Sequence, residues 1–367
     1  MTTVTELEGG ATSAPPSGGS RPTAHPVLRY VLVRLALVPV GAIGVATVSF
    51  FFVNLIPSDP VRALLGDFAT PEATAQMRHS LGLDQGLWAR YTDYLGGLFR
   101  GDLGNSYYGG SSVGADIASR LTSSLELIVL GFLVAWVLGV FVGGLSAYRR
   151  GRVTDRVGGL GMALMQAFPA YAVGLLGLYF FFHVLGWLPA PVGQVDLDTP
   201  RPPVRSGAAL VDNLLIGAWG GVGDALAHLV IPVLALGIAN SVIFARLTRL
   251  TLAAALDSPY SEFAAARGLS SWQVVRQGFR ASKVSLMTYS ATVVAGLLGG
   301  GAIIEQIFNW RGVGQWAVTG LLKSDLPVIQ GFVLLSGVVT LLAFLTADLL
   351  ILRADPRIRR PYRGGES

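Results

Sequence analysis

Residues able to do chemistry are sparse in this chain of 367 residues, and their spacing fits no familiar catalytic centre. Cysteine is absent, which excludes disulfides and thiolate metal sites, and no two histidines form an HExxH pair. The only lysines, Lys283 and Lys323, do not follow glycine, so the sequence lacks a Walker A phosphate loop. We therefore expect no catalytic residue, no bound metal and no cofactor held by this chain. The four histidines, His25, His79, His183 and His228, are scattered along the chain and are interpreted as structural or incidental.

A few ionisable residues lie in or beside apolar stretches, where lipid makes a charge costly and a functional role is the default interpretation. They are Glu126, Glu305, Asp348, Arg246 and Arg249. Glu126, Glu305, Arg249 and Asp348 lie within a turn or two of an expected helix end, where interfacial water solvates a charge. For those four residues a structural role is favoured over contact with a substrate, and a proton relay is favoured still less.

The elements that must position these residues are apolar helices. The chain is 52% hydrophobic and 13% charged, whereas soluble domains have roughly 25% charged residues. Its basic residues cluster beside apolar runs rather than on a surface interleaved with aromatics, so no nucleic-acid partner is expected.

A spanning helix needs about 20 mostly apolar residues, and the sequence predicts an all-α integral membrane protein. Six windows qualify as spans: 31–56, 125–147, 159–185, 226–246, 284–307 and 328–352.

The distribution of arginine predicts how these spans are oriented. The segments 148–156, 246–250 and 353–363 are rich in arginine and should face the cytoplasm by the positive-inside rule. Six spans place both termini on that same side. The predicted organisation is a disordered cytoplasmic tail (1–28), a first transmembrane helix (29–56), an extracytoplasmic loop (57–124), a five-helix core (125–352) and a cytoplasmic tail (353–367).

Prolines and small residues within the spans predict bends and close packing. Pro39, Pro169 and Pro232 each remove a backbone hydrogen bond, which implies bent helices beside protein or a cavity. The runs GVFVG (139–143) and GLLGGGA (296–302) permit close approach of helices. For both runs, packing is favoured over the lining of a pore.

The segment 257–283 lies between the fourth and fifth expected spans, yet it is charged and interrupted by glycine. Asp257 or Ser258 can cap a helix that begins at Pro259, and Glu262 lies in its first turn, beside the positive end of the dipole. An alanine run continues this helix, and Gly268 is suited to a left-handed stop. The pattern predicts a helix of about two turns that ends at a glycine.

A second helix is predicted directly after this glycine. Ser270 or Ser271 can cap it, and Trp272, Val275 and Phe279 recur on one face. Helices this short are marginal in water, so they require something to pack against. We therefore favour docking of a cytoplasmic partner over the alternative of a simple connection between spans.

This segment resembles the EAA coupling loop of bacterial ABC importer permeases, a Glu-Ala-Ala element followed by a glycine. Glu262, Ala264 and Gly268 take those places, while Phe263 replaces the usual first alanine. The variant YSEFAAARGLS is similar to the form found in the dipeptide/oligopeptide/nickel permease subfamily. The resemblance implies that the residues coupling this chain to an ATPase are Glu262, Ala264, Ala265, Gly268 and Leu269.

Other stretches resemble landmarks of the same subfamily, in the same order. The pattern is most similar to the first of its two paired permeases, the one with a long first outer loop. The stretches are FFVNLIPSDP (51–60), FRGDLGNSYYGGSSV (99–113), LTSSLELIVLGF (121–132), EQIFNWRGVGQW (305–316) and DLPVIQGFVLL (325–335).

The resemblance implies a type I ABC importer permease fold with six transmembrane helices and a cytoplasmic coupling helix between helices four and five. It also implies a bacterial inner membrane, a heterodimer with a second permease, an extracytoplasmic substrate-binding protein, and two ATPase subunits that bind ATP and magnesium. The chain would form half of a translocation pathway and couple ATPase closure to alternating access. No substrate-binding residue is predicted.

Several alternatives remain open. Peptides are the favoured substrate, but the same machinery also suits nickel or another small solute. A secondary transporter or channel, or an adaptor that recruits a cytoplasmic partner, is a more distant possibility. The insert-like segment 191–224 is expected on the outer side, either in contact with a binding protein or a gate, or as a tolerated surface insertion.

Overall fold

The computed structural model describes residues 25–55, 59–66, 68–200, 203 and 205–354. Within them the secondary structure is helical, apart from an isolated β-bridge between Asn105 and Ser112. The predicted all-α class is therefore confirmed. Most of the two predicted tails, residues 1–24 and 355–367, lies outside the described residues.

Five helices of the described chain are long and apolar enough to cross a membrane. Many of their large apolar side chains are exposed, including Val40, Phe52 and Phe141. Exposure of this kind is expected of helices that meet lipid or another subunit rather than water. The five helices are α1 (His25–Leu55), α5 (Val113–Tyr148), α9 (Trp219–Leu256), α11 (Ser271–Ile307) and α13 (Leu326–Ala354).

The predicted third span, 159–185, is not one straight helix. It is divided between α6 (Val153–Ala167) and α7 (Ala170–Gly177), which continues into the π-helical turn η1 (Leu178–Val184), and the two halves are bent by 96°. The break follows from Pro169, because proline forces the preceding residue out of the helical region, and Phe168 is extended. The bend expected at this proline is confirmed, whereas α1 and α9 each continue as one helix past their prolines.

Two other helix boundaries differ from the prediction. α5 begins at Val113, so the last part of the predicted outer loop 57–124 is helical and continuous with the second span. The second helix expected after Gly268 is not a separate element, because it forms the first turns of α11. Both differences arise because a helix that is stabilised by packing continues into flanking polar sequence whose composition alone does not favour a span.

The bundle is centred on the pair α5 and α9, which pack together most extensively. A Cβ atom on Gly139 or Gly143 would overlap the α9 backbone at Ser241 or Ala245, so only glycine permits this approach. The packing predicted for the first small-residue run is confirmed. The second run behaves differently, because no described atom lies within 4 Å of a Cβ placed on Gly296.

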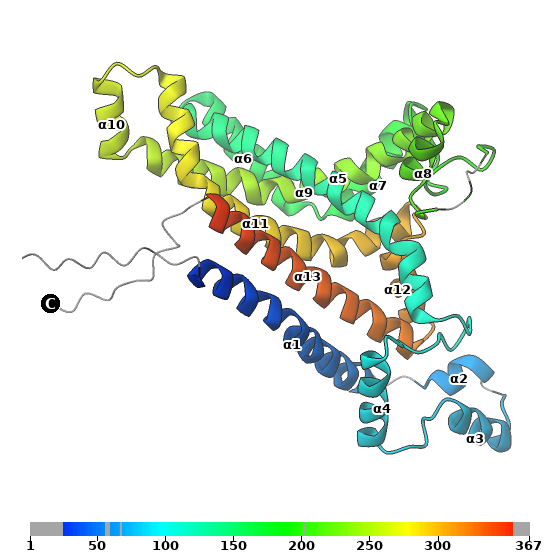
Figure 1. Cartoon of the computed structure of the whole chain (residues 1–367). Helices are drawn as coiled ribbons and strands as arrows, with labels where there is room; N and C mark the ends of the chain where they lie inside the picture. The colour runs from blue at the N-terminus through cyan, green and yellow to red at the C-terminus, as the bar shows by residue number, and fades with distance from the viewer. Residues whose placement is uncertain (1–24, 56–58, 67, 201–202, 204, 355–367) are drawn as a thin grey trace, which may run out of the picture.

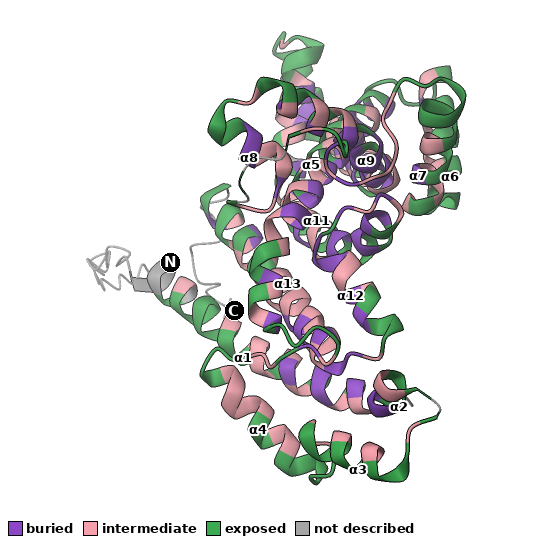
Figure 2. Cartoon of the chain, turned by 90° about the vertical axis from the view of Figure 1, so that its right-hand side faces the viewer, coloured by how far each residue is buried: buried purple, intermediate pink, exposed green. Residues whose placement is uncertain are grey.

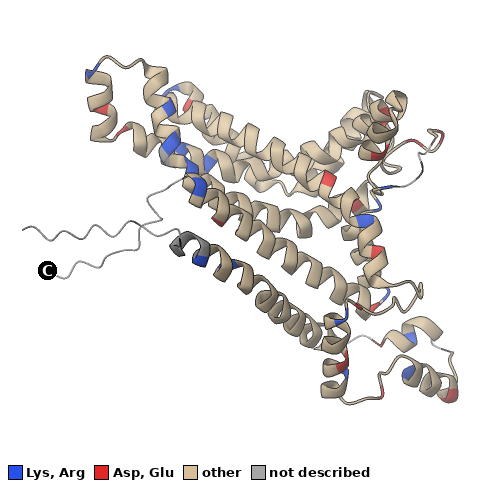
Figure 3. Ribbon diagram, in the orientation of Figure 1, with Lys and Arg blue, Asp and Glu red and all other residues tan. Residues whose placement is uncertain are grey.

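The two ends of the bundle differ in character. Figure 1 shows α10 (Pro259–Ala266) projecting at one end, where Figure 3 shows much of the Lys and Arg. Figure 2 shows buried residues concentrated along α5, α9 and α11. Short helices gather at the opposite end: α2 (Pro60–Leu65), α3 (Pro71–Ser80), α4 (Leu87–Phe99), α8 (Ala209–Ile216) and α12 (Val313–Leu322).

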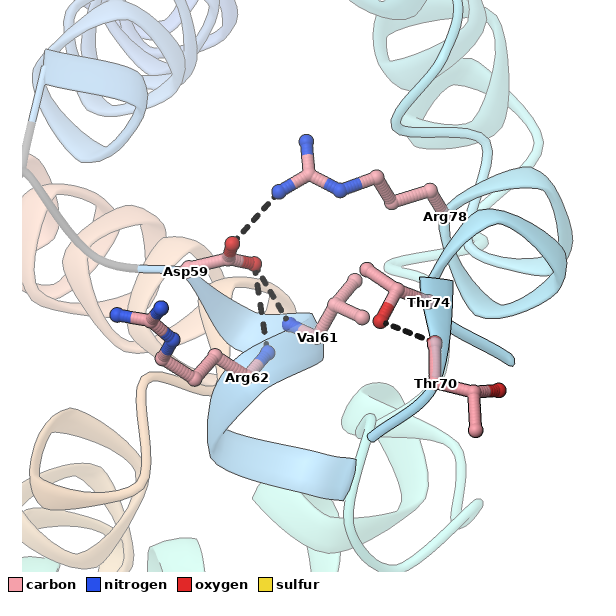
Figure 4. A network of polar contacts seen from close by, with 6 residues as sticks. All are labelled: Asp59, Val61, Arg62, Thr70, Thr74 and Arg78. Atoms are coloured by element: carbon pink, nitrogen blue, oxygen red, sulfur yellow. Dashed lines mark hydrogen bonds and ion pairs between the residues drawn. The ribbon is translucent and has the colours of Figure 1, made fainter. Parts of the chain in front are cut away.

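Asp59, the acidic residue of the FFVNLIPSDP stretch, organises the start of the first outer loop. Its Oδ1 accepts hydrogen bonds from the backbone amides of Val61 (3.1 Å) and Arg62 (3.4 Å), which caps α2 (Figure 4). Its Oδ2 pairs with the Arg78 guanidinium of α3 at 2.6 Å. One carboxylate therefore both begins a helix and fixes the next one beside it.

Candidate functional site

The predicted coupling segment forms a short helix, a glycine stop and a second helix start. α10 begins at Pro259 after an extended Ser258. The Ser258 side chain does not cap the helix, because its hydroxyl donates to the carbonyl of Ala255 at 2.7 Å. Asp257, the other candidate cap, pairs instead with Arg150. The predicted start is thus confirmed, but neither side chain caps it.

Gly268 ends this helix in a Schellman motif. Its φ of +83° lies in the left-handed region that favours glycine. Its amide donates to the carbonyl of Ala265 at 2.9 Å, and the amide of Leu269 donates to that of Ala264 at 3.2 Å. This pair of bonds satisfies the carbonyls that the helix end leaves free. Ser270 then caps α11 in a reciprocal capping box with Gln273.

Of the five predicted coupling residues, Glu262, Ala264 and Ala265 lie on α10, and Gly268 and Leu269 follow its end. Ala264 is buried, and its small side chain lets the helix lie against the bundle, while Leu269 is half-buried. Glu262, Ala265 and Gly268 are exposed. The segment therefore presents one inner contact and an outward surface, as a docking element requires.

Phe263 lies on the outward surface of the coupling segment rather than inside the bundle. It is 62% exposed, and Tyr260 on the same short helix is 67% exposed. The Arg267 guanidinium lies 5.7 Å from the centre of the Phe263 ring, a cation–π arrangement. The residue that departs from the family pattern thus enlarges an aromatic and basic surface available to a partner.

Ionic contacts join the end of α9, which leads into this segment, to α6 and to the connection between α5 and α6. Arg249 Nε and Nη2 donate to the two oxygens of Asp155 at 2.7 and 3.1 Å. Asp155 also accepts from the amide of Gly151 at 3.1 Å, and Arg150 pairs with Asp257. Bidentate guanidinium–carboxylate pairs fix orientation as well as distance. The structural interpretation of Arg249 is therefore confirmed.

Arg246 lies one helical turn from Arg249 but has a different environment. It is exposed, and among the described residues it forms no ion pair. It lines a cavity of about 650 Å³ between the broken α6/α7 pair, α9 and α11. The polar side chains of Gln166, Asn240 and Tyr289 line the same cavity. A volume of this size suits a small ligand.

The glycines of the second small-residue run help to form this cavity. Gly296 and Gly300 line it, and no atom lies within 4 Å of a Cβ placed on either of them. The expectation that this run serves helix packing is therefore wrong for these two glycines within the described chain. A run of glycines permits either close packing or an open volume, and sequence alone does not distinguish them.

Glu305 lies in α11 at the end of the bundle opposite α10. It is 2% exposed, and its carboxylate accepts hydrogen bonds from the Ser124 hydroxyl (2.5 Å) and the Gln315 amide (2.9 Å). Ser124 also accepts from the amide of Val313 at 2.8 Å, and the Trp310 indole donates to the carbonyl of Ser123 at 3.1 Å. Two of the landmark stretches thus meet in one buried network, which confirms a structural role for Glu305.

Replacing Glu305 by alanine is expected to lower the free energy of unfolding by about 2–4 kcal/mol, because buried donors lose their acceptor and a cavity forms. Thermal unfolding in detergent would measure the change. Glu305→Gln keeps the shape and one acceptor oxygen, so it should lose less, and Glu72→Ala on exposed α3 should lose little. Wild-type stability in Glu305→Ala would contradict this role.

A second outer network involves a residue that sequence reasoning passed over. Asp325, which is 2% exposed, accepts a hydrogen bond from the Ser106 hydroxyl at 2.6 Å and from the Tyr107 amide at 3.2 Å. It joins the GDLGNS stretch to the start of α13. The sequence indicated only that Ser106 and Asp325 each lie in a stretch typical of the subfamily. It did not indicate that the two stretches contact each other.

The two remaining ionisable residues differ from each other. Asp348 pairs with Arg34 at 3.2 Å, so it joins α13 to α1 in a structural role. Glu126 is different, because both of its carboxylate oxygens are buried and neither has a hydrogen-bond partner within the described chain. Asp348 therefore has the structural role that was favoured for it. For Glu126 the described chain offers no hydrogen-bond partner that would support such a role.

Comparisons with known proteins agree with this architecture. Residues 137–360 match the family described as binding-protein-dependent transport system inner membrane component, and residues 27–127 match its N-terminal companion family. The chain is 33% identical over 336 residues to a di/tripeptide transport system permease of Pseudomonas aeruginosa, covering 91% of this chain and 99% of the relative. It is 33% identical over 341 residues to a dipeptide transport system permease of Escherichia coli, with the same coverage.

A third relative has a different named substrate. It is the glutathione transport system permease of Salmonella choleraesuis, 34% identical over 335 residues, covering 91% of this chain and 99% of the relative.

Proposed function

Because the chain belongs to the inner membrane components of binding-protein-dependent transport systems, we propose that it is the permease subunit of an ABC importer for short peptides. The relatives described above are named as permeases for di- and tripeptides, dipeptides and glutathione. These solutes share a peptide backbone and a free carboxylate. Nickel, the alternative left open by the sequence, receives no support from these names.

The proposed assembly pairs this chain with a second homologous permease. A substrate-binding protein delivers solute on the extracytoplasmic side, and two ATPase subunits bind ATP and magnesium on the cytoplasmic side. The arginines near α10 support an orientation in which this end and both termini face the cytoplasm (Figure 3). No step of ATP chemistry is assigned to a residue of this chain.

Coupling is proposed to pass through α10. Its exposed Glu262, Phe263 and Ala265 would dock on an ATPase, while buried Ala264 transmits the movement to the bundle. The Schellman stop at Gly268 and the capped start of α11 make the link short and stiff. ATP-driven closure of the ATPases would bias the permease between two states in this way.

The proposed translocation pathway includes the cavity beside Arg246. The cavity is open on one side, as expected of one half of a pathway that a second permease completes. Arg246 is exposed and forms no ion pair among the described residues, so its guanidinium is free to bind a carboxylate through two hydrogen bonds. We assign Arg246 to the peptide carboxylate, with Asn240 and Gln166 as polar neighbours.

Reconstitution of the complete transporter tests this function. Proteoliposomes with this chain, its second permease, the ATPases and the binding protein should accumulate a labelled dipeptide only when ATP and magnesium are present on the ATPase side. Omitting this chain should abolish accumulation. Uptake that proceeds without ATP would instead support a secondary transporter or channel, and accumulation of nickel but not dipeptide would overturn the peptide assignment.

A further inference from the structure

Three ligating side chains converge at the outer end of α9, two of them inside the segment 191–224 whose role the sequence left open. His228 and Asp224 lie one turn apart on α9, and Asp196 comes from the irregular segment before α8. One ligand atom from each of the three lies within 4.8 Å of the others. His228 is therefore not incidental, because it is buried and lies against two carboxylates.

The hydrogen bonds of His228 fix the direction of its free ring nitrogen. Nδ1 lies 3.0 Å from the backbone carbonyl oxygen of Asp224, which can only accept, so Nδ1 carries a proton. In the neutral ring Nε2 then bears a lone pair. This atom is buried, has no hydrogen-bond partner within the described chain, and lies 3.9 Å from Asp196 Oδ1. A lone pair and a carboxylate oxygen thus face each other without a cation between them.

The surrounding contacts hold the Asp224 carboxylate, whereas no hydrogen bond within the described chain fixes that of Asp196. Asp224 Oδ2 accepts hydrogen bonds from the Asp196 amide at 2.9 Å and from the Thr199 hydroxyl at 2.7 Å. These bonds fasten the irregular segment to α9, and they leave Asp224 Oδ1 on the histidine side, 3.1 Å from Nδ1. A backbone carbonyl on Nδ1 is the usual support that orients a metal-binding histidine. The His228 residue is 5% exposed, so its ring cannot turn freely into solvent.

We propose that His228, Asp224 and Asp196 form a binding site for a divalent transition-metal cation of the zinc type. One imidazole nitrogen and two carboxylates, with water in the remaining position, suit such an ion better than magnesium or calcium, which prefer oxygen ligands alone. Zinc lies about 2.0–2.2 Å from its ligands, so the three ligand atoms must approach to roughly 3.5 Å. Asp196 supplies this movement, because its side chain is 57% exposed.

The bound cation would fasten segment 196–199 to the outer end of α9. It would thereby order the insert on the face that, in the proposed orientation, meets the binding protein. This site is independent of the transported solute, and its presence requires neither the coupling assignment nor the peptide assignment. Segment 191–224 would then be an ordered surface rather than a tolerated loose insertion.

Zinc titration of the purified full-length chain in detergent tests the site. We expect saturable, stoichiometric binding at micromolar free zinc, measured by calorimetry against a competing chelator, and no comparable binding of magnesium. Asp196→Asn should weaken zinc affinity by about ten-fold or more, since loss of even an outer-shell partner of a ligand typically costs roughly 10–100-fold. This exposed substitution should not disturb folding, and His228→Gln should weaken binding at least as strongly.

His79→Gln is the matched control. His79 lies 2.6 Å from Asp84 on the same end of the molecule but is exposed and has no third ligand. Zinc binding should be unchanged in this variant. Zinc should slow proteolysis of segment 191–208 in the wild type and in His79→Gln, but not in Asp196→Asn. The proposal is overturned if zinc does not bind stoichiometrically, or if Asp196→Asn binds as the wild type does.

Discussion

Replacing Gly268 by valine is expected to abolish peptide uptake and to uncouple substrate-stimulated ATP hydrolysis, while insertion into the membrane is preserved. The φ of +83° at this position is a genuine outlier for a β-branched residue, and a left-handed conformation costs roughly 1–2 kcal/mol for an ordinary residue. No atom lies within 4 Å of a Cβ at this position. The effect is therefore a change in backbone conformation that reorients α10, not a steric clash in the bundle.

Gly186→Val is the matched control for this prediction. Gly186 has a φ of +62°, has equally open space around a Cβ, and lies between η1 and α8, outside the coupling segment. Its replacement should impose similar strain without altering the coupling segment, so most uptake should remain. Both variants are compared by labelled dipeptide uptake and by ATPase activity of the reconstituted complex. Normal import by Gly268→Val, or equal loss in both variants, would refute the coupling role.

Replacing Arg246 by alanine is expected to reduce uptake of a dipeptide roughly ten- to a hundred-fold. The reason is the loss of a charge-assisted contact of about 1.5–3 kcal/mol with the substrate carboxylate. Coupling should survive, because Arg246 lies on the cavity and outside α10. ATP hydrolysis stimulated by the loaded binding protein should therefore stay near the wild-type rate. Arg246→Lys keeps the charge but loses the planar fork, so it should recover only part of the uptake.

Two comparisons separate substrate recognition from general damage. Single-turnover uptake from a preloaded binding protein should favour a dipeptide with a free carboxylate over its C-terminal amide in the wild type, and Arg246→Ala should remove this preference. Arg353→Ala changes another exposed arginine, on α13 and outside the cavity, and should leave both rates unchanged. A preference that persists in Arg246→Ala would show that the carboxylate is bound elsewhere.

Much of the coupling segment could be predicted because its signals are local. The helix start at Pro259 and the stop at Gly268 depend on backbone preferences of single residues, and the structure contains both. The cap that Asp257 could have formed on α10 is absent for a tertiary reason. Asp257 has a cationic partner in Arg150, which lies far away in sequence, and this ion pair competes with the local cap.

Arg246 and Arg249 illustrate what a sequence pattern leaves open. Both are arginines in the same apolar helix, and a spacing of three residues places them near one another. Arg249 has a structural role because the bend at Pro169 and the turn at Gly151 bring Asp155 beside it. Arg246 has no such partner and lines the cavity instead. The difference depends on where α6 lies, which hydropathy does not indicate.

The sequence by itself determined the helical class, the apolar segments long enough for a membrane, the asymmetry of arginine, and the glycine stop of the coupling segment. Each of these depends on composition or on the conformational preference of neighbouring residues. Tertiary structure alone decided the 96° break, the Glu305 and Asp325 networks, the cavity at Arg246 and the meeting of Asp196 with His228. Those features require side chains distant in sequence to converge, and convergence follows from packing, which no local pattern encodes.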